Sequence, residues 1–253
     1  MSAAKNGAFE SSAEALSREL GPLDPVDRVA LVLERFGDGL RFASSFGLED
    51  SVVVHLAARA RDKTRVEPRI FMLDTGRLHA ETYDLVELFR DTYGLSVSLY
   101  APNTEAVEEL VRVRGPNGFY KSKEARKACC DVRKLEPLGR ALTGATAWVT
   151  GLRREQSEGR AGVGLVEDDP ARPGVLKINP LYDWTFAKVL GFAERENVPL
   201  HPLLAKGFPS IGCAPCTRAV APGEAARAGR WWWEADDVGN AKECGIHERR
   251  GQS

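Results

Sequence analysis

The chain lacks any long hydrophobic run. No apolar stretch in its 253 residues approaches the roughly 20 residues that a membrane-spanning helix needs. The opening segment, MSAAKNGAFESSAEAL, carries acidic residues and has no hydrophobic stretch typical of a secretory signal. We therefore expect a cytoplasmic protein with no membrane partner.

An excess of charge of either sign is also missing. The 35 basic and 36 acidic residues leave a formal net charge of -1. No overall basic field attracts the chain to nucleic acid, so basic chemistry must be confined to a local site. We expect no nucleic-acid partner.

Internal repeats and low-complexity tracts are absent, and 43% of the residues are hydrophobic, which is enough for one large or two small domains. Apolar periodicity predicts helices and strands that alternate along the chain. The predicted helices are 10–20, 26–36, 49–60, 79–93 and 104–113, and the predicted strands are 40–45, 69–74, 96–100 and 147–150. This alternation predicts an α/β fold with a mostly parallel sheet flanked by helices, and ligands beyond the carboxyl ends of the strands.

Glycine, proline and charged residues concentrate in 114–123 and 157–174, which we expect to be mobile loops. The regular pattern weakens beyond Pro202. We therefore divide the chain into an α/β domain at 1–205 and an extended C-terminal segment at 206–253, which includes the CxxC pair and a mobile ECGIH tail. Roughly the first 15 residues are expected to be disordered, as chain ends often are.

Two early strands end in turns that could bind anions. The candidate ligand-binding residues are Ser44, Ser45, Phe46 and Gly47 in the first turn, and Asp74, Thr75 and Gly76 in the second. Hydroxyl groups and helix N-terminal amides can hold phosphate or sulfate oxygens, and Asp74 could accept a hydrogen bond from a ribose hydroxyl or adenine. An ordinary capping turn explains either one alone. Two such turns on adjacent strands favour a ligand site.

Cysteine is scarce, and the five cysteines are unevenly placed. Cys129 and Cys130 are adjacent, Cys213 and Cys216 form a CxxC pair, and Cys244 stands apart. Disulfides are disfavoured in the cytosol, so the two pairs suggest zinc or an iron–sulfur cluster. Adjacent cysteines suit a cluster better, because each thiolate can bind a different iron.

The tandem cysteines lie in a predicted helix over 122–135, and Pro137 makes Glu136 its expected end. Lys134 follows Cys130 by four residues and so lies on the same helix face. That position would put an ammonium group between a cluster and any ligand bound nearby. A solvated surface lysine is the alternative.

Five segments in this order give the chain a specific resemblance. They are KACCDVRKLEPL, GLRREQS, IGCAPCTR, RAGRWWWE and ECGIH. Together they resemble the assimilatory sulfonucleotide reductases over about residues 42–247, and above all the bacterial adenosine 5'-phosphosulfate (APS) reductases that carry a [4Fe-4S] cluster. The SSFGLEDS segment resembles the phosphate loop of adenine-nucleotide hydrolase-like, Rossmann-like proteins, with Phe46 where related ATP pyrophosphatases usually have glycine.

The resemblance implies roles for particular residues. It implies cluster ligation by Cys129, Cys130, Cys213 and Cys216; catalysis by Cys244, His247 and Lys134; and substrate binding by Arg160, Arg227 and Arg230. Many relatives carry a histidine just before the tandem cysteines, where this chain has Arg126.

The implied activity is reduction of APS to sulfite and AMP. A thiolate of Cys244 would attack the sulfur and form an S-sulfocysteine, which is nucleophilic covalent catalysis. With the four other cysteines assigned to the cluster, thioredoxin or glutaredoxin would supply the second thiol. We also expect a homo-oligomer.

Three other functions remain open. The substrate could be the 3'-phosphorylated nucleotide, although relatives that use it usually lack both cysteine pairs. An ATP pyrophosphatase or tRNA-thiolating enzyme should show a glycine-richer SGGxDS-type loop, which this chain lacks. A non-enzymatic iron–sulfur or zinc sensor would leave Cys244 and the arginine-rich C-terminal segment without a role.

Overall fold

A six-stranded sheet organises the part of the chain that the computed structural model describes, residues 12–234 and 245–247. Its strands are β1 (Leu40–Ala43), β2 (Ile70–Leu73), β3 (Val97–Tyr100), β4 (Ala147–Val149), β5 (Val166–Asp168) and β6 (Leu176–Ile178). They are arranged in the order β3-β2-β1-β4-β6-β5, and all neighbours pair in parallel except β5 with β6. The predicted mostly parallel α/β sheet is confirmed.

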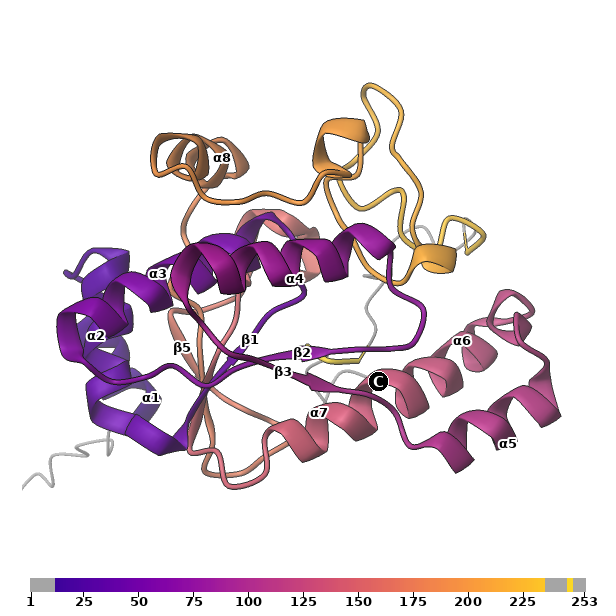
Figure 1. Cartoon of the computed structure of the whole chain (residues 1–253), viewed down its shortest axis with the longest axis horizontal. Helices are drawn as coiled ribbons and strands as arrows, with labels where there is room; N and C mark the ends of the chain where they lie inside the picture. Colours follow the sequence, from indigo (N-terminus) through magenta and orange to yellow (C-terminus); the bar gives the residue numbers. More distant parts are fainter. Residues whose placement is uncertain (1–11, 235–244, 248–253) are drawn as a thin grey trace, which may run out of the picture.

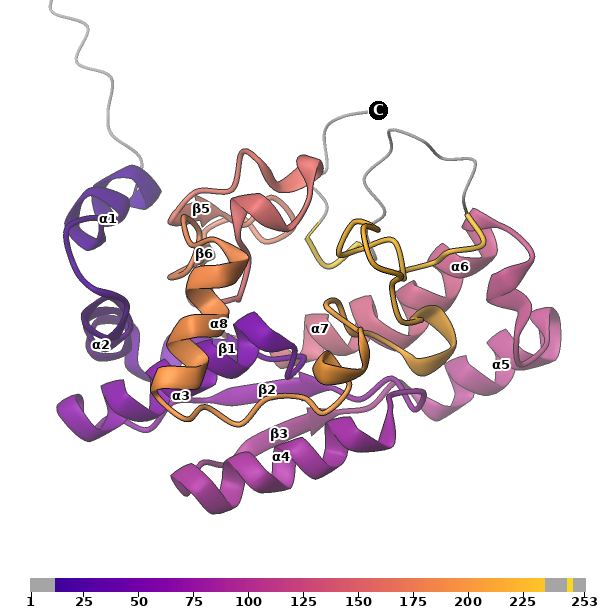
Figure 2. The same cartoon turned by 90° about the horizontal axis from the view of Figure 1, so that it is seen from above.

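Helices cover both faces of this sheet (Figure 1). They are α1 (Ser12–Leu20), α2 (Pro25–Phe36), α3 (Leu48–Thr64), α4 (Ala80–Tyr93), α5 (Thr104–Arg114), α6 (Lys123–Cys130), α7 (Glu136–Ala141) and α8 (Phe186–Arg195). Helices α3 and α4 lie over one face of the sheet, and α7 packs against the other (Figure 1). Helices α1 and α2 lie at the opposite end of the molecule from α5 and α6 (Figure 2). None of the helices in the described ranges is long and apolar enough to span a membrane.

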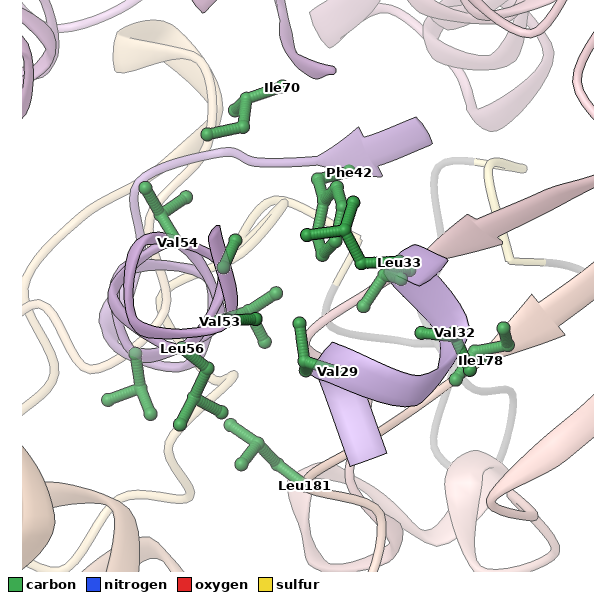
Figure 3. Close-up of a cluster of buried hydrophobic side chains, with 14 of the residues drawn as sticks. Val29, Val32, Leu33, Phe42, Val53, Val54, Leu56, Ile70, Ile178 and Leu181 are labelled. Carbon is green, nitrogen blue, oxygen red and sulfur yellow. The ribbon is translucent and has the colours of Figure 1, made fainter. Parts of the chain in front are cut away.

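The main hydrophobic core lies between the sheet and α2, α3 and α4. Side chains of α2, α3 and β1 point toward one another there, among them Val29, Val53 and Phe42 (Figure 3). Helix α3 has almost no polar face, because residues on every side of it between Ser51 and Ala60 are buried. A helix that is apolar all round is an interior helix, so the position of the α3 N-terminus is set by packing on several sides.

The second, smaller core lies on the opposite face and joins the chain's C-terminal part to the sheet. Phe71 of β2 and Trp148 of β4 pack there against Leu138 of α7, and Ile246 from the tail packs onto the same cluster. This contact holds Ile246 against the face of the sheet that α7 covers.

The sequence prediction missed β5, β6, α8 and the continuation of helix into α7. Strand β5 lies inside 157–174, which we expected to be a loop. Strands β5 and β6 have three residues each, which is too short for a period-two pattern to stand out. Strand β6 forms by pairing with β4, and β5 forms by pairing with β6, so both depend on tertiary contacts.

The predicted helix end at Glu136 is wrong. After α6 the backbone continues as a π-helix, η3 (Asp131–Leu135), and then directly as α7. The N–H of Glu136 bonds to the carbonyl of Asp131, five residues back. Pro137 therefore falls in the first turn of α7, directly after the widened π-turn and inside a continuous helical stretch.

A pair of leucine substitutions tests the assigned core. Leu56 of α3 is fully buried, whereas Leu88 of α4 is 49% exposed. We expect Leu56→Ala to lower the free energy of unfolding by about 2–5 kcal/mol, through lost apolar contacts and the cavity left behind. Leu88→Ala, also in a helix, should change it by less than about 0.5 kcal/mol. Chemical denaturation of both variants measures the difference, and equal losses would contradict this core.

Candidate active site

Both predicted turns lie at the carboxyl edge of the sheet, beside a cavity of about 270 Å³. Strands β1 and β2 are neighbours, so the turns that follow them meet at this edge. Ser44, Ser45 and Gly47 line the cavity from the first turn, and Thr75 lines it from the second. The structure thus brings the two turns together, as the strand order requires.

The first turn is held in shape by Asp50, in the first turn of α3. One carboxylate oxygen accepts hydrogen bonds from the Ser45 backbone N–H at 2.7 Å and the Ser45 hydroxyl at 2.6 Å. The other accepts from the Gly151 N–H at 3.2 Å, which ties the loop after β4 to the same point. Burial raises the pKa of Asp50 despite these hydrogen bonds. The result is a rigid cradle at the N-terminus of α3.

Phe46 does not contribute its side chain to this cavity. Its ring is fully buried and packs edge-to-face on Phe89 of α4, with ring centroids 5.3 Å apart. Its backbone φ is +55°, a left-handed value that reverses the chain within the turn. The prediction of a ligand contact by Phe46 is corrected to a core anchor, because an apolar ring gains more from burial than from an edge facing polar ligand atoms.

The second turn is mostly self-contained. Asp74 accepts hydrogen bonds from the Gly76 N–H at 2.8 Å and the Tyr83 hydroxyl at 2.7 Å. Neither Asp74 nor Gly76 lines the cavity. Only Thr75 does, and its hydroxyl lies 3.2 Å from the sulfur of Cys213. The second turn therefore links the cavity to the cysteines.

Positively charged side chains line the cavity. Lys134, Arg160, Arg227 and Arg230, all candidates from the sequence, line it. Arg160 donates to Gln156 at 2.5 Å, and Arg230 is buried and donates to the Ser210 hydroxyl at 3.2 Å. Fixed cations in a partly enclosed space are suited to binding a multiply charged anion.

His247 also lines the cavity. Its Nδ1 is 3.1 Å from Nζ of Lys177, and its ring stacks on Trp148 with centroids 5.9 Å apart. Burial, followed by the charges of Lys177, Arg160, Arg227 and Lys134, lowers its pKa well below 6.5. The imidazole is thus neutral at physiological pH, and the positive field comes from the lysines and arginines.

All four paired cysteines meet in a second, much smaller pocket of about 20 Å³. Cys130 and Cys213 are buried, and Cys129 and Cys216 are partly exposed. Within residues 12–234 and 245–247, no three His, Cys, Asp or Glu side chains are grouped so that they could hold one metal ion. Four thiols around one pocket are the ligand set of a multi-iron cluster, in which different irons take different cysteines.

Cations also surround this pocket. Its walls include Arg77, Arg126, Arg133, Lys134 and Arg230. Such a setting favours thiolates, which are the form that binds metal. Opposing this, burial raises the pKa of Cys129, and burial together with Cys213 raises that of Cys216 to about 12. The donor set and its charge therefore fit a negatively charged group bound by four thiolates.

Lys134 lies between the two pockets and lines both of them. The π-helix η3 contains Lys134 and directly follows the tandem cysteines. Arg230 and Trp231 also line both pockets. Lys134 thus lies between the cysteines and the cavity, and its role there stays a prediction.

Arg126 occupies a buried ion pair. Its guanidinium donates to both carboxylate oxygens of Glu234 at 2.6 and 3.2 Å, and the side chains are only 2% and 7% exposed. The guanidinium also lies over the Trp231 ring at 4.6 Å. Glu234 and Cys130 both raise its pKa against the effect of burial. This pair fastens the segment after Trp231 to helix α6.

Sequence reasoning missed several residues of the site. Asp50 and Lys177 were not singled out, and neither was Arg153, which is buried and pairs with Glu49 at 2.6 Å. An acidic residue in the first turn of the helix that follows the serine turn could have signalled Asp50. Lys177 sits on β6, a strand that periodicity could not identify.

Cys244, the predicted nucleophile, lies outside the described residues. Its neighbours at 245–247 are described, and Ile246 and His247 both line the cavity. The segment 245–247, which directly follows Cys244 in the sequence, therefore docks at the cavity beside the cations that face His247.

Comparison with known proteins identifies relatives across almost the whole chain. Residues 39–219 match the phosphoadenosine phosphosulfate reductase domain family. The chain is 47% identical over 240 residues to the adenosine 5'-phosphosulfate reductase of Burkholderia cepacia, covering 94% of this chain and 92% of that protein. It is 48% identical over 233 residues to that of Allochromatium vinosum, covering 92% and 86%.

Two solved structures with the same fold are enzymes whose names differ from each other. The phosphoadenylyl-sulfate reductase of Candida auris, solved as a phosphate complex, matches with a TM-score of 0.68 and 27% identity, over 83% of this chain and 98% of that one. Yeast FAD synthetase matches with a TM-score of 0.55 and 15% identity, over 83% and 69%, which is a likeness of fold alone.

The low pKa of His247 predicts a pH dependence of stability. Below pH 6.5 the unfolded chain protonates this histidine while the folded protein does not, so acid favours unfolding. The contribution of His247 to the free energy of unfolding should fall by at most about 1.4 kcal/mol per pH unit as the pH drops below 6.5. Denaturation of the wild type and His247→Gln at pH 7.5, 6.5 and 5.5 should show the difference in stability shrinking in acid. Because the other histidines are common to both proteins, parallel curves would rule out this assignment.

Proposed function

Since the chain belongs to the phosphoadenosine phosphosulfate reductase family, we propose that it reduces adenosine 5'-phosphosulfate to sulfite and AMP, with Cys244 as the nucleophile. One observation carries this proposal beyond family membership. The segment 245–247, next to Cys244, lies against the cavity, and Lys134, Arg160, Lys177 and Arg227 face its His247. A thiolate and a phosphosulfate, which repel each other in water, both need such a field.

The cavity suggests how the substrate binds. The phosphosulfate would lie among Lys134, Arg160, Arg227 and Arg230, whose charges offset those of its oxygens. The nucleoside side would extend toward the Ser44–Gly47 turn and the amides at the N-terminus of α3, which Asp50 holds in place.

The proposed reaction has three steps. The Cys244 thiolate attacks the sulfur of APS, a Cys–S bond forms, and the S–O bond to AMP breaks, so that AMP leaves with the electron pair. A thiolate of thioredoxin, or of a similar dithiol protein, then attacks the Cys244 sulfur and expels sulfite. Its second thiol releases Cys244 and leaves an oxidised disulfide on the reductant.

The 3'-phosphorylated nucleotide is the alternative substrate. The curated relatives at 47% and 48% identity are named for APS, whereas the structural relative named for the 3'-phosphorylated compound is only 27% identical. These names favour APS. A sensor without catalytic activity would have no use for a cation-lined cavity beside the tail.

We also propose a [4Fe-4S] cluster held by Cys129, Cys130, Cys213 and Cys216. The support is a shared pocket, four thiols and the cations around them. Bound there, the cluster would supply fixed negative charge and an electrostatic field beside the substrate. Lys134, which lines both pockets, would link its position to that of the substrate anion.

Other expectations stay predictions. They are the division of the chain at residue 205, with a mobile catalytic tail, a cytoplasmic location and a homo-oligomeric state. Between residue 206 and residue 234, the described part of the C-terminal segment contains a 3-10 turn at Ala214–Cys216 and no α-helix, in keeping with an appended segment.

The first experiment traps the covalent intermediate. Purified protein with APS and no reductant should gain one sulfonate on the Cys244 peptide in the mass spectrum, because no second thiol is available to release sulfite. The 3'-phosphorylated nucleotide should react more slowly. The control is Cys244→Ser, which should remain unmodified. Absence of an adduct from either nucleotide, in protein with its iron intact, would refute the proposed function.

Iron analysis tests the cluster separately from activity. Cys216→Ser should lose most of its iron and acid-labile sulfide, because one of four thiolate ligands is gone. Cys244→Ser provides a matched control of the same chemistry and should retain both. Full iron content in Cys216→Ser, or loss in both variants, would contradict the assigned ligands.

A further inference from the structure

We propose that Lys177 is a positioning residue that fixes the ring orientation and tautomer of His247, so that the nitrogen facing away from Lys177 is an N–H donor to a substrate oxygen. This inference rests on the proposed function for its substrate. The contact itself is independent of that function: Nζ of Lys177 lies 3.1 Å from Nδ1 of His247.

The tautomer follows from the chemistry of the two groups. A lysine ammonium can only donate hydrogen bonds, so Nδ1 must accept and cannot carry a proton. A neutral imidazole holds one proton on its ring nitrogens, and here that proton belongs on Nε2. His247 thus presents an N–H donor, and no additional charge, on the side of the ring opposite Lys177.

The sheet fixes Lys177 in space. It lies on β6, paired with Trp148 of β4 on one side and with Glu167 of β5 on the other. Only 7% of its surface is exposed, and its ammonium lies over the Trp148 ring at 5.1 Å. A buried lysine between two strands has little conformational freedom, so its hydrogen bond can orient a side chain from a distant part of the chain.

Trp148 supplies the surface on which the imidazole rests. The His247 ring is nearly parallel to it, at 16°, with the centroids 5.9 Å apart. The indole N–H is bonded to Asp169 at 3.1 Å, which sets the tilt of that surface. Stacking fixes the plane of the imidazole, and the lysine fixes its rotation within that plane.

The residues before His247 complete the attachment. Gly245 has φ +88°, and a Cβ at this position would meet the Leu135 side chain at 3.1 Å. Ile246 packs onto the smaller core. Gly245, Ile246 and His247 therefore dock in sequence next to Cys244, and the Lys177 contact lies at the cavity end of that docked segment.

The charges around His247 explain why a neutral donor is useful. Lys134, Arg160 and Arg227 already face this histidine in addition to Lys177. A protonated imidazole would add repulsion, whereas a directed N–H can select one oxygen of an anion without it. The neutral N–H donor therefore orients the bound anion without adding to the positive charge already present.

The tautomer is the direct test. The chain has only four histidines, so ¹⁵N-labelled histidine gives few signals, and His247→Gln assigns the one at issue. At pH 7.5 the wild-type signal should show the proton on Nε2. In Lys177→Met that preference should be lost, and in Lys177→Arg, which retains a donor, it should persist. A proton on Nδ1 in the wild type, or an unchanged pattern in Lys177→Met, would overturn the proposal.

A rate measurement links the tautomer to function. Single-turnover sulfonation of Cys244 should slow by roughly 10- to 100-fold in Lys177→Met, because a misplaced donor loses its alignment with the reacting group. Lys177→Arg should recover most of the rate, and an equal loss in both would contradict a hydrogen-bonding role. The matched control is Lys188→Met, which removes another lysine stacked on a tryptophan, 4.7 Å from Trp184 and away from the cavity wall.

The two readouts separate failure of this proposal from failure of the proposed function. Wild-type protein that is not sulfonated by either nucleotide would refute the function and leave the tautomer measurement valid. Normal wild-type sulfonation with an unaltered rate and tautomer in Lys177→Met would refute only the role of Lys177.

Discussion

Like charges concentrated in a small volume repel one another, and this structure places Lys134, Arg160, Lys177 and Arg227 around a single imidazole. Such a group persists only when the scaffold holds each member separately. Lys134 sits in a continuous helical stretch, Arg160 is bonded to Gln156, and Lys177 is enclosed between strands. The arrangement favours binding of an anion, because the folded protein already holds the cations together. Binding therefore does not have to overcome the repulsion between them.

The π-helix η3 is the local feature that joins the two pockets. Its wider turn lets the backbone pass from the tandem cysteines to Lys134 and then through Pro137 without ending the helix. As a result the cysteines and the ammonium belong to one rigid segment. Arg126, which lies on the same helix as the tandem cysteines, forms a buried pair with Glu234 that secures Trp231 and its neighbours. A buried pair of this kind gains little net stability but strongly disfavours separation, because either charge alone would remain buried without a partner.

Sequence reasoning succeeded where the signal was local or where several segments resembled one family. The alternation of helices and strands predicted the parallel sheet, and the cysteine spacing predicted that the thiols would meet. Lys134 and the three arginines, which the resemblance implied for the site, all line the cavity. It failed at Phe46, whose ring is buried in the core. The sequence alone does not distinguish a turn residue that faces a ligand from one whose side chain packs in the core. It also failed at Pro137, where a π-turn replaced the expected helix end.

By itself, the sequence determined the α/β class, the two cysteine pairs and the presence of basic residues near the tail, because these follow from periodicity, residue chemistry and motif order. Only the tertiary structure decided which residues face one another. Lys177 meets His247 across 70 residues of chain, and Asp50 meets Gly151 across 101, through strands too short and loops too irregular for a pattern to reveal. The physical reason is that a hydrophobic period reports which face of an element is buried, whereas strand order and the docking of the tail determine what lies opposite that face.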